Sequence, residues 1–535
     1  MSTPKPPLAL GPVLPDKGAV PQPILLTTLN AKYLHSAFGL RYLAANMGDL
    51  AERTRIAEFD INQRPMEILE RILEHRPALI GLGVYVWNAR QCLELVRLLK
   101  RVAPEIPLVL GGPEVSHEAD SQEICALANH VVAGEADLTF PEICRALLEP
   151  GAVPPPHFIQ AALPDPAALK MPYALYDSDD LTHRVLYVEA SRGCAFRCEF
   201  CLSSLEIPVR AFPLEAFLAE MEALYQRSAR QFKFVDRTFN LHIPTALAIL
   251  DFFRQRLDPG LFLHFEIVPD RVPGELRGAL SAFPPGSLQL EAGVQTFNPE
   301  VAERIHRRQD YARLEENLLW LRDHTNAYLH ADLIAGLPGE SLESFAAGFD
   351  RLLALRPHEI QVGILKRLRG APIARHTEAW GMIYADDAPY ELLANRDLDF
   401  STMQRLRRFA KYWDHAANSG NFPGTVQRLW AASGASPFHA FMAFTDWAYT
   451  RLKRTDSISL DTWARTLAEF LKTVSGQDAA EIQATLREDF ARCGRRDVPA
   501  FLAAARPAKA AALNKRQQRH GTGPAPQAAP SPSAA

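Results

Sequence analysis

The sequence has little that would mark a secreted, membrane-bound or disulfide-rich protein. Its 535 residues include only seven cysteines, and this odd, sparse set argues against a disulfide framework and favours a reducing, cytoplasmic compartment. No run approaches about 18 consecutive apolar residues, so we expect no transmembrane helix, and the N-terminus lacks the compact apolar core of a signal peptide. The formal net charge of −4, from 58 basic and 62 acidic side chains, is too balanced to indicate nucleic-acid or membrane binding.

An α/β domain is predicted over residues 22–150, after a proline-rich, flexible leader at 1–21. Short β-rich apolar runs such as Ile24–Leu29 alternate there with helical patterns. This alternation predicts a doubly wound, flavodoxin-like domain with a five-stranded parallel sheet. A ligand of such a sheet binds at the C-terminal ends of the strands, beside the topological switch point. Residues 151–184 are rich in proline and are interpreted as a linker.

A second series of six strand–helix repeats spans residues 185–385. It predicts a partial (β/α)6 barrel, whose chemistry belongs at the C-terminal ends of its strands. Residues 386–505 carry helical periodicity and predict a mainly helical C-terminal domain. Residues 506–535 contain no acidic residue and have low complexity, so we expect a disordered tail. RNA binding by this basic tail is a weak alternative to a solvated tail.

Three of the seven cysteines lie within eight residues, directly after the first predicted strand of the barrel. Cys194, Cys198 and Cys201 have the spacing C-x3-C-x2-C. Three thiolates can hold three irons of a [4Fe–4S] cluster and leave the fourth iron open to an exchangeable ligand. A zinc site normally needs four protein ligands, or three with a water, and no nearby histidine completes one. Three free buried cysteines are the plain alternative, but the segment also carries Gly, Arg and Glu, unlike a core segment.

The motif resembles that of the radical S-adenosylmethionine (SAM) enzymes, in which an aromatic residue precedes the third cysteine. Phe200 has that place here. The resemblance implies that the three cysteines ligate the cluster, that SAM binds the open iron, and that an electron from the cluster cleaves SAM to a 5′-deoxyadenosyl radical. Segments after the later strands, including the sequence GLPGE at 336–340, also resemble the family's SAM-binding elements. By this resemblance, SAM contacts are expected from Phe200, Asp236, Glu291, Gln295 and Gly336.

Several of these residues have a structural alternative. An acid at a strand end often caps a helix or joins an ion pair. Arg237 stands where the family commonly has an acid, so the partner that Asp236 would have in binding the SAM amino group is missing. His264 and Glu266 share one face of a strand and could reach a substrate cavity or form a structural network. No residue is singled out as catalytic.

The N-terminal domain resembles the cobalamin-binding domain of cobalamin-dependent radical SAM enzymes. Glycines at strand ends allow the backbone to approach a large flat ligand. By this resemblance, cobalamin contacts are expected from Asn30, Tyr85, Trp87, Asn88, Gly111, Gly112, Glu114, Gly134 and Glu135. The motif Asp-x-His-x-x-Gly, whose histidine ligates cobalt in other cobalamin proteins, is absent from the sequence. The resemblance therefore implies base-off cobalamin without a histidine ligand, and Tyr85 or Trp87 is a hypothetical occupant of the lower face.

Together these features resemble a bacterial subgroup of cobalamin-binding radical SAM enzymes with a C-terminal helical domain of unknown function. The resemblance implies a methyltransferase that moves a methyl group from methylcobalamin to an unactivated carbon of a small-molecule or peptide substrate. An electron donor such as flavodoxin or ferredoxin is expected, and no membrane or nucleic-acid partner. Cyclisation or rearrangement without methyl transfer, and a non-catalytic cobalamin or redox sensor, remain open.

Overall fold

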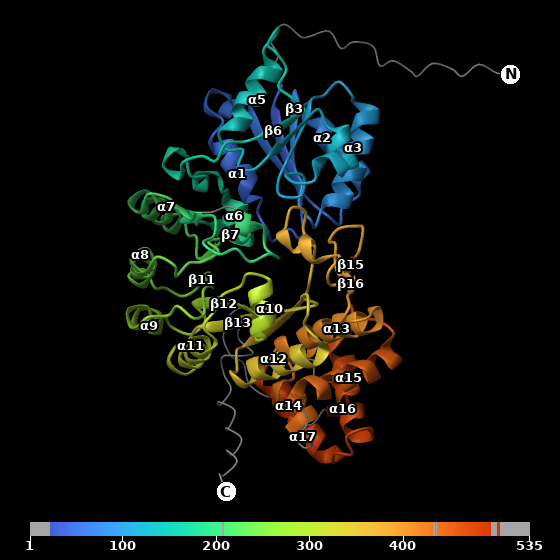
Figure 1. Ribbon diagram of the computed structural model, residues 1–535. Coiled ribbons are helices and arrows are strands. Elements are labelled where there is room, and N and C mark those ends of the chain that lie inside the picture. Colours follow the sequence, from blue (N-terminus) through green and yellow to red (C-terminus); the bar gives the residue numbers. More distant parts are fainter. Residues whose placement is uncertain (1–21, 206–207, 432–433, 435, 494–499, 503–535) are drawn as a thin grey trace, which may run out of the picture. The chain divides into compact units, whose positions relative to one another are not determined.

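The computed structural model describes residues 22–205, 208–431, 434, 436–493 and 500–502. These residues form two compact units. The first unit contains residues 22–30, 39–84 and 91–163, and the second contains residues 31–38, 85–90 and the described chain from 164 onward. The predicted leader at 1–21 and the predicted tail at 506–535 lie outside the described residues. Figure 1 shows the helices and strands of the two units.

The first unit is built on a parallel sheet in the order β2-β1-β3-β4-β5-β6. All seven residues of β1, with the sequence ILLTTLN, are buried, as expected for a parallel strand covered on both faces by helices. The order confirms the predicted doubly wound fold and places the topological switch point between β1 and β3. The strands are β1 (Ile24–Asn30), β2 (Thr54–Asp60), β3 (Leu79–Gly83), β4 (Leu108–Gly111), β5 (His130–Ala133) and β6 (Phe158–Gln160). The helices are α1 (Phe38–Ala45), α2 (Pro65–Glu74), α3 (Ala89–Val102), α4 (Glu123–Leu127) and α5 (Thr139–Leu148).

Strand β6 corrects the expectation of a five-stranded sheet followed by a linker. It comes from the proline-rich segment and pairs in parallel with β5, with Val131 opposite Phe158. The first unit accordingly extends to Leu163. The strand has only three residues, two of them exposed, so it lacks the apolar alternation that could reveal it in a sequence.

The second unit contains another parallel sheet, in the order β14-β13-β12-β11-β10-β7. Along β12 buried residues such as Leu290 and Val294 alternate with less buried ones such as Glu291 and Gln295. The buried residues join the hydrophobic core, and the less buried ones face the inside of the barrel. This arrangement confirms the predicted partial barrel and shows that its inner wall is polar. The strands are β7 (Leu186–Val188), β10 (Gln231–Phe234), β11 (Phe262–Ile267), β12 (Leu288–Gln295), β13 (Tyr328–Ala335) and β14 (Glu359–Ile364). The helices α7 (Leu214–Gln226), α8 (Ile243–Arg254), α9 (Gly274–Ser281) and α11 (Tyr311–His324) follow the outer side of this sheet in Figure 1. The unit also contains α10 (Pro299–Arg304) and α12 (Leu342–Ala354).

The chain after the barrel is mainly helical, as predicted. Four of its helices begin at a residue whose side chain accepts a hydrogen bond from the first turn, namely Asp399, Ser436, Ser459 and Asp478. Among the described residues, no helix combines the length and apolar character needed to span a membrane. A short hairpin of β15 (Ile383–Tyr384) and β16 (Leu392–Ala394) precedes the helices α13 (Phe400–Trp413), α14 (Pro423–Ala431), α15 (Pro437–Leu452), α16 (Leu460–Thr473) and α17 (Ala479–Arg492).

This helical part contacts β14, one of the two edge strands of the barrel sheet. Strand β14 is an edge strand, so alternate backbone groups of it point away from β13. The Asn418 side chain donates from Nδ2 to the carbonyl of Ile360 at 2.9 Å and accepts from the Ile360 N–H at Oδ1 at 3.0 Å. The buried carboxamide thus makes the two backbone hydrogen bonds that a residue of a neighbouring strand would otherwise make.

Candidate active site

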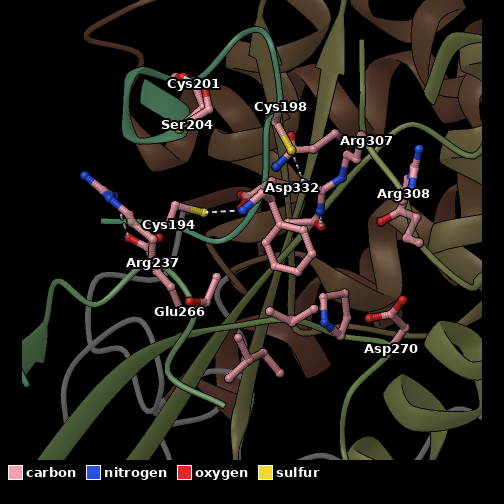
Figure 2. A pocket seen from close by; sticks show the side chains of 18 of the residues that line it. Cys194, Cys198, Cys201, Ser204, Arg237, Glu266, Asp270, Arg307, Arg308 and Asp332 are labelled. Carbon is pink, nitrogen blue, oxygen red and sulfur yellow. Dashed lines mark hydrogen bonds and ion pairs between the residues drawn. The ribbon is translucent and has the colours of Figure 1, made fainter. Parts of the chain in front are cut away.

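The cysteine segment follows β7 and lines a cavity at the C-terminal end of the barrel sheet. Cys194 and Cys198 have exposed fractions of 9% and 7%, and Cys201 is half-buried. All three line one cavity of about 230 Å³. Its walls also include residues of β11, β12 and β13 and of the loops that follow, among them those labelled in Figure 2. The structure thus brings the predicted cluster ligands to the predicted end of the barrel.

The three thiols line the same cavity but are not arranged to coordinate one metal ion together. In the part of the chain that is described, no three Cys, His, Asp or Glu side chains could hold one metal ion. A cubane does not require such a centre, because its thiolates bind different irons. Three buried polar atoms of the lining residues have no hydrogen-bond partner, namely Asp270 Oδ1, Arg307 Nε and Gln309 Oε1. Buried polar atoms are normally paired, so the cavity suits a charged, polar occupant such as a thiolate-bound cluster with SAM.

Carboxylates on adjacent strands line the same cavity as the cysteines. Arg237 Nη1 donates to Glu266 Oε1 at 3.0 Å, so the basic residue at 237 pairs with a carboxylate of the next strand. His264 Nε2 lies 2.9 Å from Glu291 Oε2. Burial alone would raise the pKa of Glu291, but the hydrogen bond from His264 and the positive charge of nearby residues lower it to about 2. Burial also lowers the pKa of His264, so at neutral pH a neutral imidazole donates to an ionised carboxylate.

A second histidine–carboxylate pair lies on β13. His330 Nε2 is 3.0 Å from Asp332 Oδ1, and the other ring nitrogen is 3.5 Å from Glu359 Oε2. Burial acts to lower the pKa of His330, but the carboxylates outweigh it and the pKa is raised. Burial raises the pKa of Asp332. For His264 and Glu266, the sequence left open a contact with the substrate cavity or a structural network. Both residues belong to a polar network, and Glu266 also lines the cavity.

The residues expected to bind SAM divide into two groups. Phe200, Glu291 and Gln295 line the cavity with the cysteines. Asp236 is buried and instead accepts hydrogen bonds from the Ala190 N–H at 3.0 Å and the Ser191 hydroxyl at 2.6 Å, which ties β10 to the start of the cysteine segment. Burial raises the pKa of Asp236 to about 6. Gly336 and Asp236 are not among the lining residues of this cavity, and their contact with SAM stays a prediction.

Arg307 is a site residue that the sequence did not reveal. Its Nη1 lies 3.5 Å from Cys198 Sγ, and its Nη2 donates to the carbonyl of Gly293. Hydrogen bonds to thiolate ligands stabilise the charge of an iron–sulfur cluster and raise its reduction potential. The residue follows a helix more than a hundred positions after the cysteines, so no local spacing connects the two.

In the first unit, several residues expected to contact cobalamin lie at C-terminal strand ends. Asn30 ends β1 and donates to Glu58 Oε2 at 2.8 Å. Gly111 ends β4, and Gly112 follows with φ of 104°. A Cβ at Gly112 would lie 2.5 Å from the carbonyl oxygen of Val84, so only glycine lets these two loops approach. Gly134, with φ of 85°, and Glu135 follow β5, and Glu114 is buried near Gly112. This strand edge fits a flat ligand held largely by backbone.

The remaining expected cobalamin contacts lie in the segment 85–90, which belongs to the second unit. Tyr85 and Trp87 stack with ring centroids 4.4 Å apart and planes 8° apart. Asn88 is buried, and its Oδ1 accepts from the Tyr85 N–H at 2.8 Å, which closes a tight turn. Trp87 is 46% exposed, so this stacked pair offers an aromatic surface. Its role toward cobalt stays a prediction.

Three known protein families match three successive segments of the chain. Residues 24–144 match the B12 binding domain, residues 188–352 match the radical SAM superfamily, and residues 378–522 match a family described as protein of unknown function (DUF4080). The chain therefore belongs to the radical SAM enzymes that carry a B12 binding domain, with a DUF4080 domain at its C-terminal side. The cofactors of these domains are SAM, a [4Fe–4S] cluster and cobalamin.

The chain spans about half the length of the curated relatives it matches. It is 27% identical over 234 residues to an uncharacterized methyltransferase, PH0819, from Pyrococcus horikoshii, covering 39% of this chain and 50% of the relative. It is 27% identical over 342 residues to the 2-(S-pantetheinyl)-carbapenam-3-carboxylate methyltransferase of Streptantibioticus cattleyicolor, covering 56% of this chain and 48% of the relative.

Two solved structures share the fold. The methyltransferase TsrM from Kitasatospora setae, with cobalamin and a [4Fe–4S] cluster bound, is similar with a TM-score of 0.53 and 19% identity, over 69% of this chain and 81% of that chain. The cobalamin-dependent SAM radical enzyme OxsB is similar with a TM-score of 0.55 and 13% identity, over 87% of this chain and 78% of that chain. Both likenesses concern the fold and leave the reaction of this chain open.

Proposed function

We propose that this protein is a cobalamin-dependent methyltransferase that transfers a methyl group to an unactivated carbon. The observation that carries the proposal is the C-x3-C-x2-C segment lining a carboxylate-walled cavity at the strand ends of a barrel, in a chain that also has a B12 binding domain. The two curated relatives described above are named as methyltransferases. When bound, the reduced cluster supplies the electron that cleaves SAM to a 5′-deoxyadenosyl radical, and cobalamin supplies the methyl group.

The residues of the chain bind the cofactors, orient the reactants and exclude water from the site. Cys194, Cys198 and Cys201 hold the cluster, and the partly buried, ionised Glu291 provides a negative charge in the same cavity. Asp332 also lines the cavity, where its pairing with His330 Nε2 at 3.0 Å fixes the position of a further carboxylate. Such fixed groups place reactants without reorganising during the reaction. A flavodoxin or ferredoxin is the proposed electron donor.

A reaction without methyl transfer is the second candidate. OxsB, which covers the largest share of this chain among the structures described here, is named for its cobalamin and radical chemistry and not for methyl transfer. The two candidates differ in their products. Methyl transfer yields S-adenosylhomocysteine together with 5′-deoxyadenosine, whereas cyclisation or rearrangement yields no S-adenosylhomocysteine.

The test is a comparison of wild type with Cys194→Ala and Cys493→Ala, purified and reconstituted without oxygen. Cys493 lies beyond α17 and outside the cavity, so its variant controls for the loss of a thiol. We expect wild type and Cys493→Ala to hold about four irons and one cobalamin, in keeping with a single [4Fe–4S] cluster, and to form 5′-deoxyadenosine from SAM. Cys194→Ala should form none. Equal SAM cleavage by Cys194→Ala would overturn the assignment, and a count of S-adenosylhomocysteine separates the two candidates.

A further inference from the structure

Glu199 stands between the second and third cysteines of the motif, and its carboxylate is the meeting point of three basic side chains. Only 2% of the side chain is exposed. Its oxygens lie 2.7 Å from His376 Nε2, 2.9 Å from His306 Nδ1 and 2.6 Å from Arg375 Nη2. Arg375 also donates from Nε to Glu199 at 2.9 Å, so the guanidinium grips both oxygens. Several charge-assisted hydrogen bonds hold this buried carboxylate in one position, and removing any one partner of such a buried group is costly.

The backbone of Glu199 is held at the same place from both sides. Its N–H donates to the carbonyl of Ile305 at 3.1 Å, and its carbonyl accepts from the N–H of Ile373 at 2.9 Å. Ile373, Arg375 and His376 belong to a short 3-10 turn at 372–376, which leads directly into the DUF4080 domain. The cysteine segment is therefore fastened to the turn where that domain begins.

The same domain also packs on the GLPGE turn that follows β13. A Cβ at Gly336 would lie 2.5 Å from Leu392 Cδ2 and 3.2 Å from Met403 Cε. A Cβ at Gly339 would lie 2.7 Å from the indole of Trp380. Both glycines have positive φ, 94° and 79°, a backbone conformation that favours glycine.

We propose that the first part of the DUF4080 domain, residues 378–403, together with the turn before it, is a brace that holds the cysteine segment and the GLPGE turn in register, with Glu199 as its positioning residue. This inference rests on the proposed function, in which the three cysteines hold the cluster. It gives the DUF4080 domain a role inside the barrel's own site.

The brace has a physical consequence for the cluster. Removing the Glu199 carboxylate leaves the buried His376 without its acceptor and frees the segment that carries Cys198 and Cys201. Residues that orient metal ligands typically change metal retention by about 10- to 100-fold when they are replaced. Loss of a negative charge beside the cluster also raises its reduction potential.

The experiment measures iron release from reconstituted full-length protein to a chelator, together with the cluster's reduction potential. The variants are Glu199→Ala, Glu199→Gln, His376→Gln and the double variant Glu199→Ala/His376→Gln. Arg197→Gln is the matched control, because Arg197 lies in the same segment, is exposed and carries charge without joining the brace. Near-UV circular dichroism before reconstitution shows whether each variant is folded.

We expect Glu199→Ala to release iron at least about tenfold faster than wild type, and Glu199→Gln to show a raised potential with slower release than the alanine variant. The double variant should release iron no faster than Glu199→Ala alone, because both changes open the same brace. Arg197→Gln should release iron like wild type. Folded Glu199 variants with wild-type iron release, or additive effects in the double variant, would overturn the brace. Wild-type protein that holds no cluster would instead overturn the proposed function.

Discussion

Glu340, the last residue of the GLPGE turn, makes the stability of the second unit depend on pH. Its side chain is buried and accepts from the Thr296 hydroxyl at 2.5 Å. Burial raises the pKa of Glu340 from 4.5 to about 7. Ionising this residue is therefore harder in the folded chain than in the unfolded chain.

The sign and size of the effect follow from linkage. Because the folded pKa exceeds the unfolded one, stability is fully present below pH 4.5 and is lost as pH rises toward 7. Between pH 5 and pH 8, these two pKa values imply a loss of about 2–3 kcal/mol from this group alone. Glu340→Gln keeps an oxygen for Thr296 but does not titrate, so the variant should escape this loss.

The assay is urea unfolding of wild type and Glu340→Gln at pH 5 and at pH 8. All seven tryptophans belong to the second unit, so tryptophan fluorescence follows its unfolding. Histidines titrate in the same range in both proteins and cancel in the difference. We expect the variant to gain about 2–3 kcal/mol relative to wild type between the two pH values. A difference that stays constant from pH 5 to pH 8 would show that Glu340 does not titrate as this reasoning requires.

Two further predictions concern the expected cobalamin contacts. Gly112→Ala places a Cβ against the Val84 carbonyl at a positive φ and should destabilise the first unit by roughly 2–4 kcal/mol; faster amide hydrogen exchange in β3 and β4 checks this, and unchanged protection argues against it. Trp87→Ala and Tyr85→Ala each remove one ring of the stacked pair. If either ring covers the lower face of cobalt, its variant changes the absorption spectrum of bound cobalamin, and identical spectra in both variants remove the idea.

Local signals in the sequence were sufficient for the fold class and for the cysteine segment. Strand–helix alternation and the C-x3-C-x2-C spacing are both short-range patterns, and the end of a parallel strand places Gln295 in the cavity. Asp236 obeys the same rule of position, yet its carboxylate binds the adjacent loop backbone. The strand-end rule predicts where a side chain begins but not which partner it reaches.

What the sequence could not predict depends on contacts between distant positions. Arg375 lies 176 positions after Glu199, and no spacing in the chain marks the pair. Strand β6 failed for a different reason, since three mostly exposed residues pair through the backbone and leave no apolar pattern. In both cases the information lies in backbone or long-range pairing and not in local side-chain order.

The carboxamide of Asn418 has a consequence for how the chain is made. Asn418 lies 58 positions after Ile360, so β14 leaves the ribosome well before the side chain that closes its edge. Until that moment the nascent barrel presents an open strand, the feature through which partly made proteins pair with one another. We therefore expect a chain that ends before residue 418 to aggregate more than the full chain, even though all six of its barrel strands are present.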